Sequence, residues 1–440
     1  MTGRLRNLSR ELPNRPRDFW DLLWTPVGRQ RLWVGVSWLA WPVLGTLASL
    51  RRRTLLKRTK VVAVVGSYGK TTTTRAVARA LGVDEPSGGR NSWSHLAWKV
   101  LRHRAGVPLV IEVGISRPGQ MRTYARMLRP DMVVVTSVGG EHRTSFTGGR
   151  TVQSEKALMV RSLAPGGVAI LNGDDALAAA MAADALGKVV RFGLSEKNDV
   201  RAEQLRLDWP RGTDFTLVGP GFRLAAKVGL VGGHSLGAAL AAAAVAGELG
   251  VPPDDVVRRL ACLTPTPGRM QPVVLPSGVV LLRDDYKSGL ETIHAALTVL
   301  GEIPARRRIV VLGDVTEPEG PQRQVYRSLG ERVARSASRI LYIGHKFGPL
   351  ASGARQAGLA RGDVTQHANV FALAETLKNE LKEGDVVLLK GRTNQKLERT
   401  ALILSGRTVR CGISSCHIRS FPCESCPLVE TGWGTRRPVT

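Results

Sequence analysis

The residues best suited to chemistry form a glycine-rich loop with the sequence GSYGKTTTT, which begins at Gly66. Glycines such as Gly66 and Gly69 let backbone N–H groups close around phosphate oxygens at the start of a helix. In loops of this kind a lysine reaches the β- and γ-phosphates and the next hydroxyl coordinates Mg²⁺. Lys70 and Thr71 occupy those two positions, and Thr72 follows in the same pocket. The pattern predicts a nucleotide phosphate site.

The segments around this loop predict an α/β fold. The loop follows the apolar run VVAVV at residues 61–65, which is typical of a buried parallel strand, and precedes a helical segment at 75–81. Further strand-like runs alternate with helical segments such as 120–128, 152–163 and 236–249; these runs lie at residues 109–113, 132–136, 168–171, 279–282, 309–312, 340–343 and 386–389. This alternation indicates parallel sheets covered by helices.

Composition and linkers divide the 440 residues into four expected parts. We expect a basic, Trp-rich arm at 1–58, a central α/β domain with the phosphate loop at 59–264, a second α/β domain at 265–408 and a cysteine-rich tail at 409–440. A hydrophobic content of 43% is that of an ordinary globular protein. A formal net charge of +27 predicts anionic partners. We expect no nucleic acid among them, because no nucleic-acid-binding motif is present.

The short loop GxxGKTTT resembles that of the Mur ligase family, and the resemblance extends from Lys60 to Arg407. It is strongest to the branch that adds D-alanyl-D-alanine. The family implies a P-loop central domain and a Rossmann-like ligase domain. It also implies an ATP-dependent amide-bond-forming ligase, in which a substrate carboxylate becomes an acyl phosphate that an amine then attacks.

The same resemblance implies a set of magnesium ligands, with two Mg²⁺ sites. Glu112 lies in the family's motif after the second core strand, here IEVG, and a carboxylate at the end of a parallel strand faces the ligand crevice in any case. His142, in the pair Glu-His, matches a residue that helps hold the second Mg²⁺. Lys156 falls where the family carries a carbamylated lysine, whose carbamate contacts metal.

Further matches imply nucleotide and substrate contacts. Asn172 lies in a turn near the nucleotide, Arg269 reaches the phosphates, and Asp285 stands where a carboxylate binds the ribose. Lys390 and Arg392 match a turn that contacts the incoming amino substrate, or they form a basic surface turn. The sequence departs from the family where two asparagines of the motif HN…N are absent after His234, and where the motif DDxYNANP is altered after Asp285; these departures are seen in the segments HSLG and DDYKSGL.

The N-terminal arm indicates contact with a membrane. Residues 1–60 hold 13 Lys and Arg, three acidic residues and five of the nine Trp, and residues 32–50 contain no charge. Basic residues and Trp around an apolar run are typical of a membrane interface. A span needs about 20 apolar residues, so we expect a span or re-entrant anchor at 32–50, or else an interfacial or buried helix. Arg51, Arg52 and Arg53 follow the run, and by the positive-inside rule they place the body at the cytoplasmic face of the membrane.

Four cysteines in the tail, Cys411, Cys416, Cys423 and Cys426, have spacings close to those of a four-thiolate zinc site. An iron–sulfur cluster, a redox role and unbound thiols are the alternatives. A zinc site would help to fold a tail that has little core of its own.

The expected function is ligation of an amino acid or dipeptide to an anionic cell-envelope precursor at the membrane. The family resemblance implies a preceding sugar-nucleotide domain of roughly 80–100 residues. Only about 60 residues precede the loop here, so we expect that a partner protein could supply acceptor recognition. A membrane-associated poly-glutamate synthase and a non-ligating nucleotide-binding scaffold are the alternatives.

Overall fold

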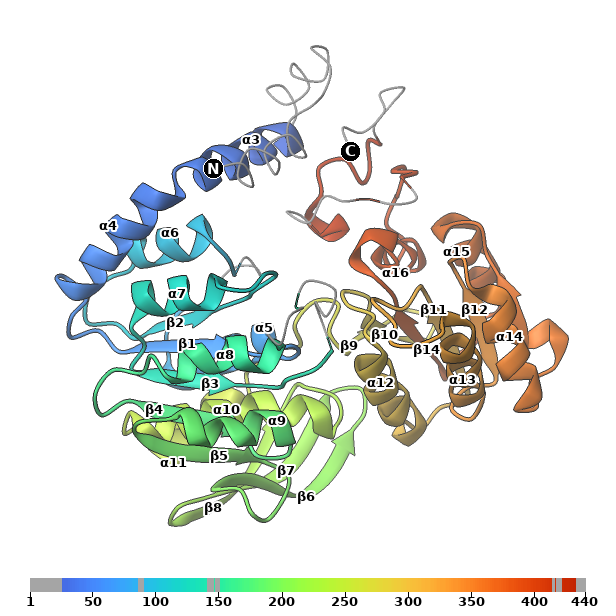
Figure 1. The fold of residues 1–440 in the computed structure, drawn as a ribbon. Coiled ribbons are helices and arrows are strands. Elements are labelled where there is room, and N and C mark those ends of the chain that lie inside the picture. The colour runs from blue at the N-terminus through green and yellow to red at the C-terminus, as the bar shows by residue number, and fades with distance from the viewer. Residues whose placement is uncertain are drawn as a thin grey trace. The chain divides into compact units, whose positions relative to one another are not determined.

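The computed structural model describes residues 26–85, 91–140, 146, 151–413, 416 and 422–432. Within it the chain divides into two compact units, one over residues 41–266 and the other combining residues up to 40 with those from 267 onward. Each unit is built around one mostly parallel sheet (Figure 1). The α/β fold with two sheets, predicted from the alternating apolar runs, is confirmed.

The sheet of the first unit has the strand order β2-β1-β3-β4-β5-β6-β7-β8. Its pairings are parallel from β2 to β6 and antiparallel from β6 to β8. The strands are β1 (Val61–Val65), β2 (Leu109–Glu112), β3 (Met132–Val135), β4 (Val168–Asn172), β5 (Lys188–Gly193), β6 (Val200–Asp208), β7 (Gly212–Gly219) and β8 (Phe222–Val228). All residues of β1, β2 and β3 are buried, as expected for parallel strands covered on both faces.

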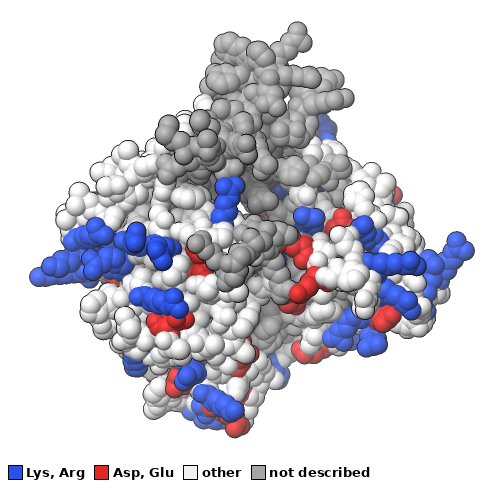
Figure 2. All heavy atoms as spheres, viewed as in Figure 1, with Lys and Arg blue, Asp and Glu red and all other residues white. Residues whose placement is uncertain are grey.

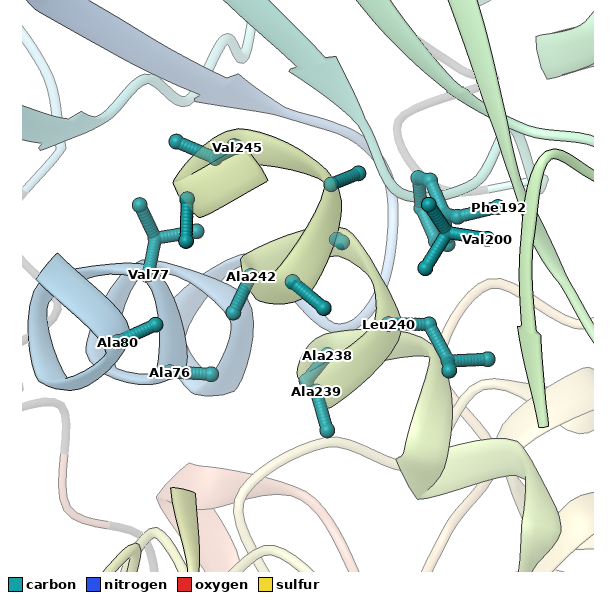
Figure 3. Packing of buried hydrophobic residues seen from close by; sticks show 14 of the residues in the cluster. Ala76, Val77, Ala80, Phe192, Val200, Ala238, Ala239, Leu240, Ala242 and Val245 are labelled. Carbon is teal, nitrogen blue, oxygen red and sulfur yellow. The ribbon is translucent and has the colours of Figure 1, made fainter. Parts of the chain in front are cut away.

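Two groups of helices cover this sheet (Figure 1). One group comprises α4 (Trp41–Arg53), α6 (Ser94–Arg102), α7 (Gln120–Leu128), α8 (Val152–Val160), α9 (Ala176–Ala179) and the 3₁₀ helix η2 (Ala180–Asp184). The other comprises α5 (Lys70–Leu81), α10 (Gly233–Glu248) and α11 (Pro253–Leu260). Figure 3 shows how the alanines of α10, among them Ala239 and Ala242, let it lie close to Ala76 and Val77 of α5. This contact fixes the helix that begins at the glycine-rich loop.

The sheet of the second unit has the order β13-β12-β11-β14-β10-β9, with β9 as its antiparallel edge. Its strands are β9 (Gln271–Val274), β10 (Val280–Asp284), β11 (Arg307–Leu312), β12 (Arg339–Tyr342), β13 (Val364–Gln366) and β14 (Asp385–Lys390). Its helices are α12 (Leu290–Glu302), α13 (Gln322–Ala334), α14 (Phe347–Gln356), α15 (Val370–Glu380) and α16 (Glu398–Leu404), with 3₁₀ turns η3 (Arg361–Asp363), η4 (Thr393–Gln395) and η5 (Cys423–Ser425). The helix α3 (Pro26–Leu39) groups with this unit.

The apolar run at 32–50 does not form one long helix. It divides between α3 and α4, which are separated at Ala40, and no helix in the described part of the chain is long and apolar enough to cross a membrane. One face of α4 is buried, with Trp41, Leu44 and Ala48 against its own unit. The uncharged run is therefore explained in part by packing, which a count of charges along the sequence cannot detect.

Arg52 anchors the end of α4 to the first unit. It is 6% exposed and donates to the backbone carbonyls of Leu128, Leu56 and Arg129 and, over 2.9 Å, to Oδ2 of Asp131. The same Asp131 oxygen accepts the N–H of Val61, the first residue of β1. The hydrogen bonds of this arginine thus join α4 to the start of β1.

We predict that Arg52→Ala lowers the free energy of unfolding by about 3 kcal/mol, because it leaves a partly buried carboxylate and several carbonyls without their donor. Urea unfolding followed by tryptophan fluorescence measures the change. The matched control is Arg53→Ala on the same helix, where the exposed side chain predicts an effect within about 0.5 kcal/mol. Equal stability of the two variants would contradict the anchoring role.

Candidate nucleotide and metal site

The glycine-rich loop has the backbone geometry of a phosphate cradle. Gly66 has φ +153°, and a Cβ there would lie 1.9 Å from Oγ1 of Thr136 at the end of β3. Gly69 has φ +81° and is the N-cap of α5. Because it has no side chain, no side-chain hydrogen bond caps the helix. The N-terminus of α5 therefore opens into the loop without a competing side chain at its cap, which is the arrangement that favours an anion.

Lys70 lies inside this loop. The side chain is buried, and Nζ donates to the carbonyl oxygens of Gly66 at 2.6 Å and Ser67 at 3.0 Å. An ammonium held at this point lies beside the volume that the loop encloses and can transfer its hydrogen bonds to a phosphate. This placement is compatible with the predicted contact to the β- and γ-phosphates.

The side chains of Thr71, Glu112 and Asn91 form a connected oxygen-rich group. Thr71 Oγ1 donates to Glu112 Oε2 over 2.8 Å, and Asn91 Nδ2 donates to the other carboxylate oxygen over 2.6 Å. Glu112 is 5% exposed. A hydroxyl and a carboxylate beside a phosphate loop are the donors that Mg²⁺ prefers, so Thr71 and Glu112 fit the ion, and Asn91 orients the carboxylate.

The structure leaves the rest of the predicted magnesium site untested. His142 lies outside the described residues. Among the residues that are described, no group of three or more His, Cys, Asp or Glu side chains could hold a metal ion. The magnesium ligation predicted for Glu112, Thr71 and His142 therefore stays a prediction.

Lys156 reaches the loop from the buried face of α8. It is 2% exposed, and its Nζ donates to Ser67 Oγ over 2.6 Å. Ser67 Oγ also accepts the N–H of Gly139 at 2.9 Å. A lysine 89 residues beyond the loop residue that it contacts is thus brought to the phosphate loop. Carbamylation stays a prediction.

Thr72 and Asn172 contact neighbouring segments. Thr72 Oγ1 lies 3.1 Å from Thr266 Oγ1. Asn172 Nδ2 donates to the carbonyl of Thr136 over 2.8 Å, and its Oδ1 accepts the N–H of Asp174 over 3.0 Å. In this state Asn172 holds the turn after β4 next to the turn after β3. Its predicted nucleotide contact would have to share these amide groups.

The second unit brings together Arg269 and Asp285, the nucleotide contacts predicted there. The guanidinium of Arg269 lies over the ring of Tyr286, 4.3 Å from its centre. Asp285 is buried and accepts from Arg283 Nε over 3.1 Å. Burial raises the pKa of Asp285 to about 6, although Arg283 opposes the shift. Asp285 directly follows β10, and Arg269, which precedes β9, reaches the same turn through its contact with Tyr286.

Lys390 and Arg392 are placed differently from each other. Lys390 is 1% exposed, and its Nζ donates to Asp284 Oδ2 over 2.5 Å. Burial lowers the pKa of Lys390, and Asp284 opposes the shift. A substrate carboxylate at Lys390 would have to compete with Asp284, whereas Arg392 is half-buried at the start of η4. Their substrate contacts stay predictions.

Three of the four tail cysteines, Cys411, Cys416 and Cys423, lie near Arg399 of α16. This arginine is 1% exposed; its Nε donates to Cys423 Sγ over 3.2 Å, and Nη1 donates to the carbonyls of Cys411 and Ile413. Cys411 and Cys416 also lie close enough to raise the pKa of Arg399 and that of Cys426. Burial raises the pKa of Cys423 to about 12. All four thiols are free of disulfides. In the described part of the chain the tail cysteines form no group that could hold a metal ion, so the zinc site stays a prediction.

Three residues of these sites were missed by sequence reasoning: Asn91, Ser67 and Arg399. Ser67 lies inside the loop motif at a position that the motif leaves open. Asn91 follows the segment Gly-Gly-Arg and precedes a helix, which is a weak signal. Nothing in the sequence around Arg399 distinguishes it from the many other arginines.

A phosphate loop at a helix N-terminus, a carboxylate on the next strand and a buried lysine define an α/β nucleotide-dependent phosphoryl-transfer enzyme. The Mur ligase middle domain matches residues 64–246 of the chain, and the Mur ligase glutamate ligase domain matches residues 268–393. The chain belongs to the Mur ligase family and is an ATP-dependent ligase that forms an amide bond between a carboxylate and an amine. Enzymes of this family use ATP and Mg²⁺.

Named relatives share this organisation. The UDP-N-acetylmuramoyl-tripeptide–D-alanyl-D-alanine ligase of Mycobacterium tuberculosis (strain CDC 1551 / Oshkosh) is 30% identical over 355 residues, which cover 75% of this chain and 70% of that protein. The Escherichia coli (strain K12) enzyme of the same name is 28% identical over 387 residues, covering 82% and 79%. MurF ligase from Thermotoga maritima in complex with ADP has a similar fold, with a TM-score of 0.71 at 22% identity, covering 83% and 84%.

We predict that Asn91→Ala raises the Mg²⁺ concentration needed for half-maximal ATP turnover about tenfold, because a residue that orients a metal ligand is worth 10–100-fold in affinity or activity. A Mg²⁺ titration at saturating substrates measures the effect. Asn379→Ala, at an exposed position of α15, is the control and should leave the titration unchanged. An unchanged Mg²⁺ requirement in Asn91→Ala would show that Glu112 needs no such support.

Proposed function

We propose that this ligase extends a peptide on an anionic cell-wall precursor, adding an amino acid or dipeptide to a precursor carboxylate. The names of the relatives support a muramoyl-peptide carboxylate as acceptor and D-alanyl-D-alanine as amine. The observation that carries the proposal is the joining of Lys70, Thr71, Glu112 and Lys156 at one loop. Asp285 and Arg269 are the proposed nucleotide contacts of the second unit.

The proposed reaction has two steps. A carboxylate oxygen of the acceptor attacks the γ-phosphorus of ATP. The bond between this phosphorus and the oxygen that bridges it to the β-phosphate breaks, so that an acyl phosphate forms and ADP is released. The amine nitrogen then attacks the acyl carbon, and a tetrahedral intermediate expels phosphate while the amine loses a proton to solvent. Lys70 and the N-terminus of α5 offset the charge that spreads over the transferring phosphoryl group.

Thr71 and Glu112 would hold Mg²⁺, and we propose that His142 and a carbamylated Lys156 serve a second ion. When bound, the metal neutralises phosphate charge and polarises the phosphoryl oxygen. The residues of the chain contribute the rest: Asn91 fixes the rotamer of Glu112, and Ser67 fixes the end of Lys156 against the loop.

We predict that Lys156→Ala reduces phosphate release from ATP at least about 100-fold, a loss typical of removing one preorganised electrostatic contact. The assay supplies ATP and Mg²⁺ with pairs of candidate acceptors and amines, and bicarbonate is added to test for a carbamate. Lys197→Ala, on an exposed turn, is the matched lysine control. The proposal would be overturned, in favour of a non-ligating nucleotide-binding protein, if no acceptor–amine pair gave phosphate release. Equal release by wild type and Lys156→Ala would overturn it as well. Release only with glutamate polymers would favour the poly-glutamate synthase.

Membrane association belongs to the same proposal. The basic arm and its tryptophans, with 13 Lys and Arg in residues 1–60, support a ligase that works at the cytoplasmic face of the membrane.

We also propose that Cys411, Cys416, Cys423 and Cys426 bind zinc. The observation behind this is Arg399, a buried cation that the described residues pair with a sulfur and with carbonyl oxygens and with no carboxylate. Buried charges need compensation, and four thiolates on Zn²⁺ carry a net charge of about −2 that the guanidinium would offset. The metal would draw the four sulfurs together around one centre.

We predict that the protein, purified without chelators, contains about one zinc ion per chain and that Cys423→Ser or Cys426→Ser loses it, since three thiolates hold Zn²⁺ far less firmly than four. Elemental analysis by mass spectrometry measures the content. Cys262→Ser is the control, because Cys262 is exposed and lies outside the tail. A wild-type chain free of zinc and of iron would leave Arg399 among unbound thiols and refute the site.

A further inference from the structure

The outer face of α4 is apolar and exposed. Val43, Leu47 and Leu50 are 63%, 48% and 57% exposed, and Leu55, just beyond the helix, is 65% exposed. At about 100° per residue, Val43, Leu47 and Leu50 fall within about 60° of one another around the helix axis. Trp41, Leu44, Ala48 and Arg52 point to the opposite side and are buried. The helix therefore carries two apolar stripes, one packed against its own unit and the other directed to solvent.

Cations surround the end of this stripe. Residues 41–60 contain six Lys and Arg and no acidic residue. Arg53, Lys57 and Arg58 are exposed and form no ion pair with any described residue, while Arg52 and Lys60 are engaged with Asp131. Figure 2 shows Lys and Arg side chains gathered where Figure 1 places the C-terminal end of α4.

The neighbouring helix α6 adds to this positive surface. Arg51 Nη2 donates to the carbonyl of His103 over 2.9 Å, so the end of α6 lies beside the end of α4. Arg102 and Arg104, on either side of His103, are exposed. The apolar stripe of Val43, Leu47, Leu50 and Leu55, together with the cations at 53, 57, 58, 102 and 104, is called the α4 face below.

We propose that the α4 face docks on an anionic phospholipid bilayer, with α4 lying in the plane of the interface. Aliphatic side chains would enter the acyl boundary while Arg and Lys contact phosphate headgroups, which is how interfacial helices bind. A helix of 13 residues is about 20 Å long, too short for a bilayer core of about 30 Å. The absence of acidic residues from 41–60 favours a lipid surface over a protein partner of mixed charge.

Docking through α4 would orient the ATP site. Trp41 on the inner face packs edge-to-face on Trp93 and Tyr124, with ring centres 5.3 and 6.0 Å away. Trp93 is two residues from Asn91, which holds Glu112. The helix and the metal-binding carboxylate are thus parts of one packed unit, so a bound α4 keeps the phosphate loop at a fixed position relative to the membrane. This inference extends the proposed membrane association and does not depend on the identity of the ligase substrates.

The test is sedimentation of the full-length chain with mixed phosphatidylglycerol–phosphatidylcholine vesicles and with pure phosphatidylcholine vesicles. We expect binding to the anionic vesicles only, weakened at least about tenfold by the triple variant Val43→Ser/Leu47→Ser/Leu50→Ser and by Arg53→Glu/Lys57→Glu/Arg58→Glu. The matched control Leu177→Ser/Leu186→Ser/Leu205→Ser removes three exposed leucines elsewhere in the same unit and should bind as wild type does.

Two outcomes would overturn this assignment. Vesicle binding that is equal in wild type and both α4 variants would move the membrane contact elsewhere in the chain. A wild-type chain that ignores vesicles but forms a dimer, which the serine variant dissociates, would make a second copy the occupant of the α4 face. Lys156→Ala should bind vesicles like wild type, so loss of ligation and loss of docking are measured separately.

Discussion

The position of β1 between β2 and β3 is the constraint on which the site depends. Because β1 pairs in parallel with both neighbours, the carboxyl ends of three strands meet at one edge of the sheet. The loop after β1 therefore has Glu112 of β2 on one side and Thr136, which follows β3, on the other. Ligands in open α/β sheets bind at such an edge, where neighbouring connections leave on opposite sides. No single residue creates this site; the strand order does.

This constraint explains which parts of the site could be predicted. Motifs that are local in sequence, such as the loop from Gly66 to Thr72, carry their own geometry because glycine conformation and helix start are set within a few residues. Glu112 could be predicted because it ends a recognisable strand. Asn91 could not, because its contact with Glu112 depends on how the segment before α6 returns to the sheet. Likewise the pairing of Lys390 with Asp284 follows from the register of β14 against β10, which the sequence of neither strand reveals.

The role of the apolar run in the N-terminal arm could not be decided from the sequence. Residues 32–50 lack charge, and an uncharged run of that length is compatible with a membrane span or with a packed helix. Which of these applies is decided by tertiary contacts: Arg52 uses its charge on Asp131 and on three carbonyls, and Trp41 enters an aromatic group. A composition average treats Trp41 and Val43 alike, although one is buried and the other is exposed.

The aromatic group of Trp41, Trp93 and Tyr124 then connects α4 to the candidate metal site of the first unit. Each of its three edge-to-face pairs is worth roughly 0.5–1.5 kcal/mol beyond its buried area, and Tyr124 Oη also accepts the N–H of Trp93. The backbone from Trp93 back to Asn91 is held by these contacts and by the carbonyl of Asn91, which accepts the N–H of Gly114. Glu112 therefore owes its orientation to a chain of contacts that starts on α4. The inner face of α4, a helix that composition left open to a membrane role, thus helps to support the carboxylate of Glu112, the predicted metal ligand.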